Sequence, residues 1–185
     1  TVILMQEGFN VVSFSLYHKL GFGVRSVFLA IKGDPPRVNL DTGKGTRLRP
    51  IAPEDLDEIA ALDEKLTGLA RRADFEFVLR YGRGVLALDG AKMRGFGFAL
   101  GNESGWNVGP VITYDEETAE TLIYAVRGDK AGSMFIRVDA RHPALLNRLY
   151  RHGFVLDTIS TLMVRGPYRP PDAVALPSLF PEVLA

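Results

Sequence analysis

Three consecutive acidic residues, Asp115, Glu116 and Glu117, stand at the start of a predicted helix, DEETAETLIYAVRG, directly after the strand-like GWNVGPVITY. Carboxylates at a helix N-terminus accept hydrogen bonds from its unpaired N–H groups and complement the helix dipole, each contributing about 0.3–1 kcal/mol. The same charges repel a phosphate group that would need those donors. We therefore predict a helix that is stabilised by its own side chains and holds no nucleotide at its N-terminus.

The sequence shows no pattern of a metal-binding site, a cysteine-based site or a phosphate-binding loop. The histidines His18, His142 and His152 lack metal-ligand spacing and are predicted to be surface residues of helices. The chain has no cysteine, which excludes disulfides and thiolate metal sites. The segment GKGT lacks the upstream glycine of a phosphate-binding loop, so we interpret it as part of a linker.

A second candidate group lies in NVVSFSLYHKLGF, which begins at Asn10. Asn10 is a suitable N-cap for a helix that runs to about Leu20, and Gly21 is a suitable stop. From residue types alone, Asn10 is a helix cap and Tyr17 a packed aromatic residue.

Two further groups each have a structural and a functional interpretation. Arg71, Arg72 and Arg80 form a solvated basic face or attract an acidic substrate. Trp106 and Asn107 anchor the core or line a substrate groove.

The predicted elements alternate between strands and helices only toward the end of the chain, which favours a mixed sheet over a fully parallel one. After an initial β-α-β unit, the order is β-α-α-β-β-β-α-β-α-β, with a hairpin at Asp89-Gly90 and a proline-rich tail that we expect to lie extended over the surface. The predicted strands cover 1–8, 24–33, 46–51, 84–90, 93–102, 105–114, 133–140 and 154–166; the predicted helices begin near residues 10, 53, 73, 115 and 142.

A strand-helix-strand unit occurs twice. Gly21 and Gly153 both precede phenylalanine, and at that offset (153 − 21 = 132) TVILMQEG aligns with SMFIRVDA. The second copy follows a complete set of further elements, whereas the first begins the chain. We interpret residues 1–33 as the last third of one domain, 34–45 as a linker, 46–170 as a second domain of the same kind, and 171–185 as a tail.

The phrase VILMQEGFNVVSFSLYHKLGF resembles the late motif of the GNAT superfamily of N-acetyltransferases: strand, Asn, a helix bearing Tyr, then Gly-Phe and a strand. The whole resembles proteins with two GNAT domains in tandem and a divergent C-terminal domain. The resemblance implies an α/β fold with a central mixed, mostly antiparallel sheet flanked by helices, in which the pantetheine arm of acetyl-CoA lies between two splayed parallel strands. It further implies acetyl transfer to an amine, with Asn10 binding the coenzyme and Tyr17 protonating the departing thiolate.

The predicted second domain departs from this family at two places. The family's Gln/Arg-x-x-Gly-x-Gly/Ala motif should follow WNVGPVI, but the sequence there is TYDEETAETLI. The ungapped alignment, which the Gly-Phe pair favours, puts Leu149 in the tyrosine position and His142 in the asparagine position. A helix one residue shorter would put Tyr150 and Pro143 there.

We therefore expect residues 46–170 to be degenerate for acetyl-CoA binding, and the complete protein to acetylate an unidentified small-molecule amine with acetyl-CoA as co-substrate. The alternative is a non-catalytic GNAT-like module that binds a partner, shapes an acceptor pocket or dimerises. A homo-oligomer, or strand exchange through the N-terminal β-α-β unit, would cover its exposed strand edges.

The composition argues against three further classes: nucleic-acid-binding, membrane-spanning and secreted proteins. Lys plus Arg and Asp plus Glu each number 22, so the net charge is zero, which argues against nucleic acid as a partner. No apolar run approaches the roughly 18 residues of a membrane span. With no secretory signal pattern and no cysteine, we expect a cytoplasmic protein.

Overall fold

The computed structural model describes residues 1–35, 46–102, 105–128 and 132–177 of the chain. The predicted linker beyond Pro35 and the predicted tail beyond residue 177 lie outside the described residues. The strands are β1 (Val2–Glu7), β2 (Gly23–Gly33), β3 (Thr46–Pro50), β4 (Arg83–Asp89), β5 (Lys92–Asn102), β6 (Gly105–Thr113), β7 (Ser133–Asp139), β8 (Val155–Arg165) and β9 (Val174–Leu176). The helices are α1 (Val11–Lys19), the short 3-10 turn η1 (Pro53–Asp55), α2 (Leu56–Thr67), α3 (Arg72–Tyr81), α4 (Glu116–Arg127) and α5 (Pro143–Arg151).

The described strands form one nine-stranded sheet in the order β1-β8-β2-β7-β6-β5-β4-β3, with β9 paired to β6. Among these pairs, β6 and β7 run parallel and the others antiparallel. The predicted fold class, a mixed and mostly antiparallel sheet flanked by helices, is confirmed.

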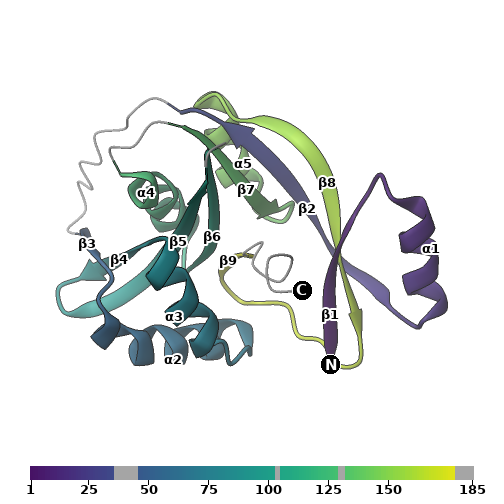
Figure 1. The fold of residues 1–185 in the computed structure, drawn as a ribbon, viewed down its shortest axis with the longest axis horizontal. Coiled ribbons are helices and arrows are strands. Elements are labelled where there is room, and N and C mark those ends of the chain that lie inside the picture. The colour runs from purple at the N-terminus through teal and green to yellow at the C-terminus, as the bar shows by residue number, and fades with distance from the viewer. Residues whose placement is uncertain (36–45, 103–104, 129–131, 178–185) are drawn as a thin grey trace.

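Helices cover both faces of the β3–β7 half of the sheet (Figure 1). On one face, α4 and α5 bury Leu122, Ile123 and Leu149 in the larger core cluster. On the other face, α2 and α3 bury Ile59 and Phe75 in a second cluster. The strands of this half alternate their side chains between the two clusters, as a sheet buried on both faces requires.

The repeat seen in the sequence is a repeat in structure. Helices α1 and α5 are offset by 132 residues at both ends (143 − 11 and 151 − 19), and so are β2 and β8 (155 − 23 and 165 − 33). Gly21 and Gly153 both end their helices with positive φ, at 84° and 90°. The ungapped alignment is therefore confirmed, and Leu149, not Tyr150, occupies the position equivalent to Tyr17.

The two units exchange their last strands. Strand β2 pairs with β7 of the second unit, and β8 pairs with β1 of the first unit, while β2 and β8 pair with each other. The register is symmetric: Val2 opposes Arg165, and the equivalent Met134 opposes Gly33. The N-terminal unit is thereby built into the sheet of the rest of the chain.

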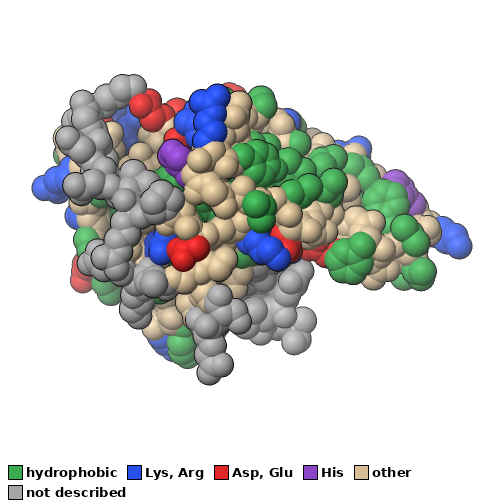
Figure 2. Space-filling view, turned by 90° about the horizontal axis from the view of Figure 1, so that it is seen from above, with side chains coloured by type: hydrophobic (Ala, Val, Ile, Leu, Met, Phe, Trp, Pro, Cys, Tyr) green, Lys and Arg blue, Asp and Glu red, His purple; other side chains and the backbone are tan. Residues whose placement is uncertain are grey.

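Helix α1 stands apart from the other helices (Figure 1) and buries none of its residues. Four apolar side chains on it or just before it are strongly exposed: Phe9 at 77%, Val11 at 67%, Val12 at 78% and Leu16 at 51%. In the space-filling view, hydrophobic side chains gather at this end of the molecule (Figure 2). Its counterpart α5 buries Leu145, Leu146 and Leu149.

The tail contains a strand that the sequence did not predict. The expectation of a surface-lying segment is wrong for Val174–Leu176, because these residues form β9 against β6 and bury Val174 and Leu176. Three residues are too short a run to give a periodic signal between the neighbouring prolines.

Candidate functional site

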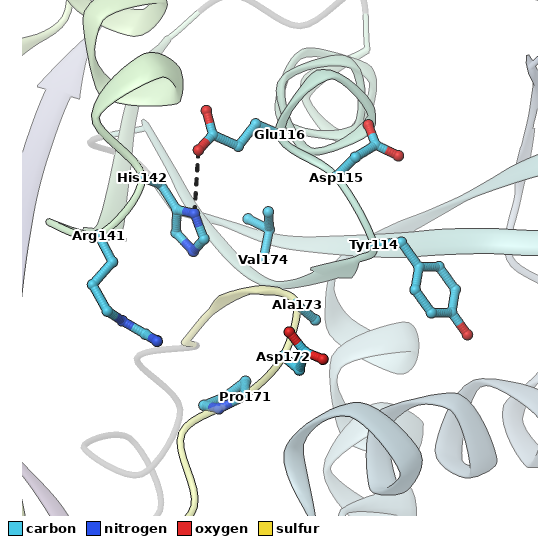
Figure 3. A pocket seen from close by; sticks show the side chains of 9 residues that line it. All are labelled: Tyr114, Asp115, Glu116, Arg141, His142, Pro171, Asp172, Ala173 and Val174. Atoms are coloured by element: carbon cyan, nitrogen blue, oxygen red, sulfur yellow. Dashed lines mark ion pairs between the residues drawn. The ribbon is translucent and has the colours of Figure 1, made fainter.

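A pocket of about 370 Å³ lies where the chain leaves β6 and β7. The first turns of α4 and α5 meet there, and the chain segment that leads into β9 closes the third side (Figure 3). The carboxyl ends of adjacent parallel strands are a common place for a ligand site in mixed sheets. The lining residues are Tyr114, Asp115, Glu116, Arg141, His142, Pro171, Asp172, Ala173 and Val174.

Asp115 is the N-cap of α4, as its position in the sequence predicted. Its Oδ1 accepts a hydrogen bond from the Thr118 backbone N–H at 2.8 Å, and its Oδ2 lies 3.0 Å from the Thr118 hydroxyl and 3.4 Å from Arg94 Nη2. Burial raises the pKa of Asp115, but the hydrogen bonds from Thr118 and Arg94 outweigh it and hold the pKa below its usual value. The residue is therefore a carboxylate at neutral pH and occupies donors that a bound anion would need.

Glu116 crosses the pocket to the start of α5. Its Oε1 lies 3.3 Å from His142 Nδ1 (Figure 3). Its Oε2 lies 3.7 Å from Arg148 Nη2. His142 is the N-cap residue of α5, the position that Asn10 holds in α1. The structure thus joins the acidic cluster to a histidine that the sequence placed on an exposed helix surface.

The contact between α4 and α5 continues this polar network. Arg148 Nε donates to Glu120 Oε2 at 2.6 Å, and the Tyr124 hydroxyl lies 2.7 Å from His152 Nδ1. Burial, reinforced by the charge of Glu120, raises the pKa of Tyr124. Tyr124 is therefore a neutral hydrogen-bonding partner of His152 across the helix pair.

A second carboxylate anchors the start of α5 from β7. Asp139 accepts from the Arg141 backbone N–H at 2.9 Å and from the Ser26 hydroxyl of β2 at 2.8 Å. Burial raises the pKa of Asp139, and the hydrogen bonds from Arg141 and Ser26 bring it below its usual value. This group ties the exchanged strand β2 to the loop that carries His142.

The two residues that family resemblance suggested for chemistry lie elsewhere. Asn10 caps α1, with its Oδ1 accepting from the Ser13 backbone N–H at 3.1 Å. Tyr17 is half-buried, and its ring lies edge-on to Phe22 with a centroid separation of 5.8 Å. Both side chains belong to α1 and neither lines the pocket. These contacts are those expected of a cap and a packed aromatic residue, and they test no chemical role.

Three of the other sequence candidates, Arg71, Arg72 and Trp106, have structural partners. Arg71 binds the buried carboxylate of Asp63 through two hydrogen bonds, at 2.9 and 2.7 Å. Arg72 pairs with Asp57 and Glu76, and Trp106 is buried in the larger core cluster. Arg80 and His18 are exposed and lie away from the pocket. Within the described ranges, no group of three or more His, Asp or Glu side chains is arranged to hold a metal ion.

The sequence missed the pairing of Glu116 with His142 and of Tyr124 with His152. Each pair joins residues on two different helices, so no local spacing reveals it. The available signal was the identical offset of the two units, which placed His142 at the cap position next to a parallel-strand end. The described helices include none long and apolar enough to cross a membrane.

The described residues thus form a mixed sheet with one parallel strand pair, whose carboxyl ends open between two helix N-termini. The model of a GNAT acetyltransferase domain matches residues 59–176. The chain therefore belongs to the GNAT family of acetyltransferases.

Solved structures of other proteins share the fold of this chain. An acetyltransferase structure from Pyrococcus horikoshii is 16% identical to this chain and superposes with a TM-score of 0.67. The match covers 94% of this chain and 57% of that protein. A GCN5-related N-acetyltransferase from Sphaerobacter thermophilus is 14% identical, with a TM-score of 0.60. This match covers 92% of this chain and 62% of that protein. The chain thus spans about three fifths of the length of these proteins. No curated protein sequence matches it.

Proposed function

We propose that this chain is the C-terminal part of a tandem GNAT enzyme that transfers an acetyl group from acetyl-CoA to a small-molecule amine. In this proposal, residues 1–33 complete a first GNAT domain, whose site includes Asn10 and Tyr17. Residues 46–170 form a second domain that does not bind acetyl-CoA. The net charge of zero fits a small-molecule acceptor better than nucleic acid.

The first support is the unequal covering of the two equivalent units. In the second unit, β6 pairs with the outer edge of β7, and α4 packs on α5. In the first unit, the described residues place β8 on one edge of β1 and nothing on the other. A strand and a helix arranged like β6 and α4 would cover the free edge of β1 and the exposed face of α1.

Side chains at equivalent positions support the same arrangement. Arg148 and His152 of α5 contact α4, and their equivalents on α1 are Leu16 and Leu20. Leu16 is 51% exposed and Leu20 is 49% exposed. A covering helix would bury apolar surface at these two positions, so the interface that we propose is apolar where the second unit is polar.

The residues at the start of α4 do not fit acetyl-CoA. A coenzyme diphosphate at that helix would need the backbone donors that Asp115 already uses, and it would face the carboxylates of Asp115, Glu116 and Asp172. The tyrosine position of this unit holds Leu149, which is fully buried and has no proton to donate. We therefore derive no catalytic step for the second domain.

In the first domain, the proposed roles rest on the chemistry of two side chains. Asn10 uses Oδ1 as the helix cap, which leaves its amide N–H₂ group to donate to a carbonyl of the co-substrate. Tyr17 donates its phenolic proton to the departing thiolate as the amine attacks the thioester carbonyl. A phenolic hydroxyl is a suitable proton donor for a thiolate leaving group.

The substitution Tyr17→Phe in the longer tandem protein tests this role. We expect kcat for acetyl transfer to fall by roughly 10²–10⁴-fold with little change in KM, because a general acid acts in the transition state. The matched control is Tyr150→Phe, an exposed residue one position after the equivalent site on α5. An unchanged kcat in Tyr17→Phe would exclude Tyr17 as the acid.

The substitution Asn10→Ser tests the coenzyme contact separately. Serine is about as good an N-cap as asparagine, so stability should hold while the amide donor is lost. We expect KM for acetyl-CoA to rise several-fold, as measured by steady-state kinetics. A stable variant with wild-type KM would place the contact elsewhere.

The alternative is that the protein is a non-catalytic GNAT-like module for partner binding, acceptor-pocket shaping or dimerisation. The exposed apolar face of α1 favours it, because such a face also suits a protein partner or a second copy. Thioester consumption by the longer protein with a panel of primary amines separates the two. Turnover supports the enzyme, whereas absence of turnover together with a concentration-dependent oligomer supports the module.

A further inference from the structure

Strands β6 and β7 separate part-way along their length. They pair in parallel from Gly105 opposite Ser133 to Val108 opposite Ile136, and the pairing stops there. At this point Gly109 and Pro110 of β6 lie opposite the single residue Phe98 of β5, so β6 has one extra residue between the positions that oppose Ala99 and Gly97. A bulge bends its strand, and Pro110 has no N–H to donate, so the two strands diverge beyond it. We call the space between Val111–Thr113 and Arg137–Asp139 the wedge.

Strand β9 must lie on the wedge side of β6. Residues Val111–Thr113 pair with β9, with Val111 opposite Leu176 and Thr113 opposite Val174. The other edge of the same three residues is already paired with β5, from Gly97 to Gly95. A strand has two edges, so β9 takes the edge that β7 holds further back along β6. Contacts between β7 and β9 agree with this position.

The side chains of β9 are part of both cores. Val174 is 2% exposed and Leu176 is fully buried, and both belong to the cluster that α4 and α5 cover. Ala175 points to the opposite face and packs on the cluster under α2 and α3. This alternation shows that β9 extends the sheet rather than lying across it.

We propose that the wedge is a binding site for an extended polypeptide segment, and that its resident ligand is β9 of the same chain. Strand addition to the open edge of β6 supplies the backbone hydrogen bonds, and the two buried side chains supply the apolar contact. The wedge is therefore closed to any other extended ligand, including the pantetheine arm of acetyl-CoA. The 370 Å³ pocket is what is left at its mouth, beyond Val174.

This occupancy is independent of the acidic residues at α4. The carboxylates act at the mouth of the wedge, whereas β9 fills its interior. The inference goes beyond the proposed function, since it holds whether or not the first domain is an enzyme. It also predicts that neutralising Asp115, Glu116 and Glu117 leaves the wedge closed.

A disulfide across β6 and β9 tests the proposal in the complete chain. Ile112 and Ala175 face each other, and opposed Cα atoms of antiparallel strands lie about 4.5–5.5 Å apart, within the range of a disulfide. The chain has no cysteine, so Ile112→Cys with Ala175→Cys introduces a single pair. The control, Ile112→Cys with Ala173→Cys, is two residues out of register. We expect rapid, complete oxidation of the first pair and little of the second.

Hydrogen exchange and activity complete the test. We expect amides of Val111–Thr113 and Val174–Leu176 to be protected at least 10²-fold over unfolded rates, with no change on addition of millimolar acetyl-CoA. The oxidised, locked form of the longer protein should retain wild-type acetyl transfer. Loss of protection at β9 with acetyl-CoA, equal oxidation of both pairs, or loss of activity on locking that reduction restores would overturn the proposal. Failure of Tyr17→Phe to reduce activity would overturn the enzymatic role of Tyr17 and leave this inference standing.

Discussion

At the scale of single residues, the same carboxylates that stabilise α4 determine what its N-terminus can bind. Asp115 accepts from Thr118, and Glu116 pairs with His142. A phosphate-binding helix start leaves such donors to its ligand, so side-chain capping and anion binding compete for the same groups. The prediction that no phosphate group binds at the start of this helix could therefore be made from the acids in TYDEETAETLI alone.

Replacing the cap measures its contribution to stability. Asp115→Ala removes the acceptor of the Thr118 N–H and should lower the free energy of unfolding by about 0.5–2 kcal/mol. Asp115→Asn is the matched control, since it keeps the cap and removes the charge, and it should cost less. Urea unfolding at neutral pH compares the two. Equal and negligible losses in both variants would show that α4 does not depend on this cap.

The titrating residues predict how stability depends on pH. The pKa values of Asp55, Asp115 and Asp139 lie below their usual value in the folded chain. In the unfolded chain they titrate near pH 3.9. Their contribution is therefore complete above about pH 5 and is lost as the pH falls below about 4 through the folded values. Urea midpoints at pH 7, 5 and 3 should be similar at the first two and clearly lower at the third.

At alkaline pH, stability depends on a group whose pKa is raised in the folded chain, not lowered. Burial raises the pKa of Tyr124, so the folded chain keeps its phenolic proton above pH 10, where the unfolded chain loses it. Stability should fall as the pH rises beyond about 10, and Tyr124→Phe should reduce that slope. An unchanged slope in Tyr124→Phe would assign the alkaline loss to other groups.

At the scale of elements, the two copies of one unit differ in how well they are covered. Leu149 of α5 is fully buried, whereas Leu16 of α1 is 51% exposed. Leu149→Ala should lower the free energy of unfolding by about 2–5 kcal/mol through the cavity that it leaves. Leu16→Ala in the same chain should change it by no more than about 0.5 kcal/mol. A large loss from Leu16→Ala would show that α1 is already packed.

Local signals fixed most of the element bounds. Gly21 and Gly153 end their helices where a left-handed residue was expected, and the predicted bounds of α5 and β8 lie within two residues of the observed ones. Strand pairing was not predictable in the same way. Which strand lies beside β7 is decided by contacts more than 100 residues apart, and β2 takes that place although β8 follows β7 more closely in the chain. β9 escaped prediction because its role depends on the open edge of β6, not on its own three residues.

At the scale of the whole molecule, the exchanged strands β2 and β8 make one sheet from two units that the described residues cover unequally. Around β7, the described chain supplies a neighbour for each edge and a helix to cover α5. Around β1, it supplies one neighbour and leaves α1 exposed. The pseudo-symmetric frame therefore specifies the shape of the covering partner that we propose, a strand-helix unit like β6 and α4.

In the tandem enzyme that we propose, the same frame holds one unit that binds acetyl-CoA and one that does not. The second domain keeps the parallel strand pair of a GNAT fold, yet its wedge holds β9, its helix start holds carboxylates, and its tyrosine position holds Leu149. Three independent features thus argue that the second domain has no acetyl-CoA site. They support the proposal that acetyl transfer belongs to the unit that carries Asn10 and Tyr17.

Calorimetric titration of this 185-residue chain with acetyl-CoA tests most directly the central claim that the second domain has no acetyl-CoA site. We predict no saturable heat up to millimolar coenzyme, both for the wild-type chain and for the triple variant Asp115→Asn, Glu116→Gln and Glu117→Gln. Micromolar binding to the wild-type chain, accompanied by loss of amide protection at Val174–Leu176, would contradict it.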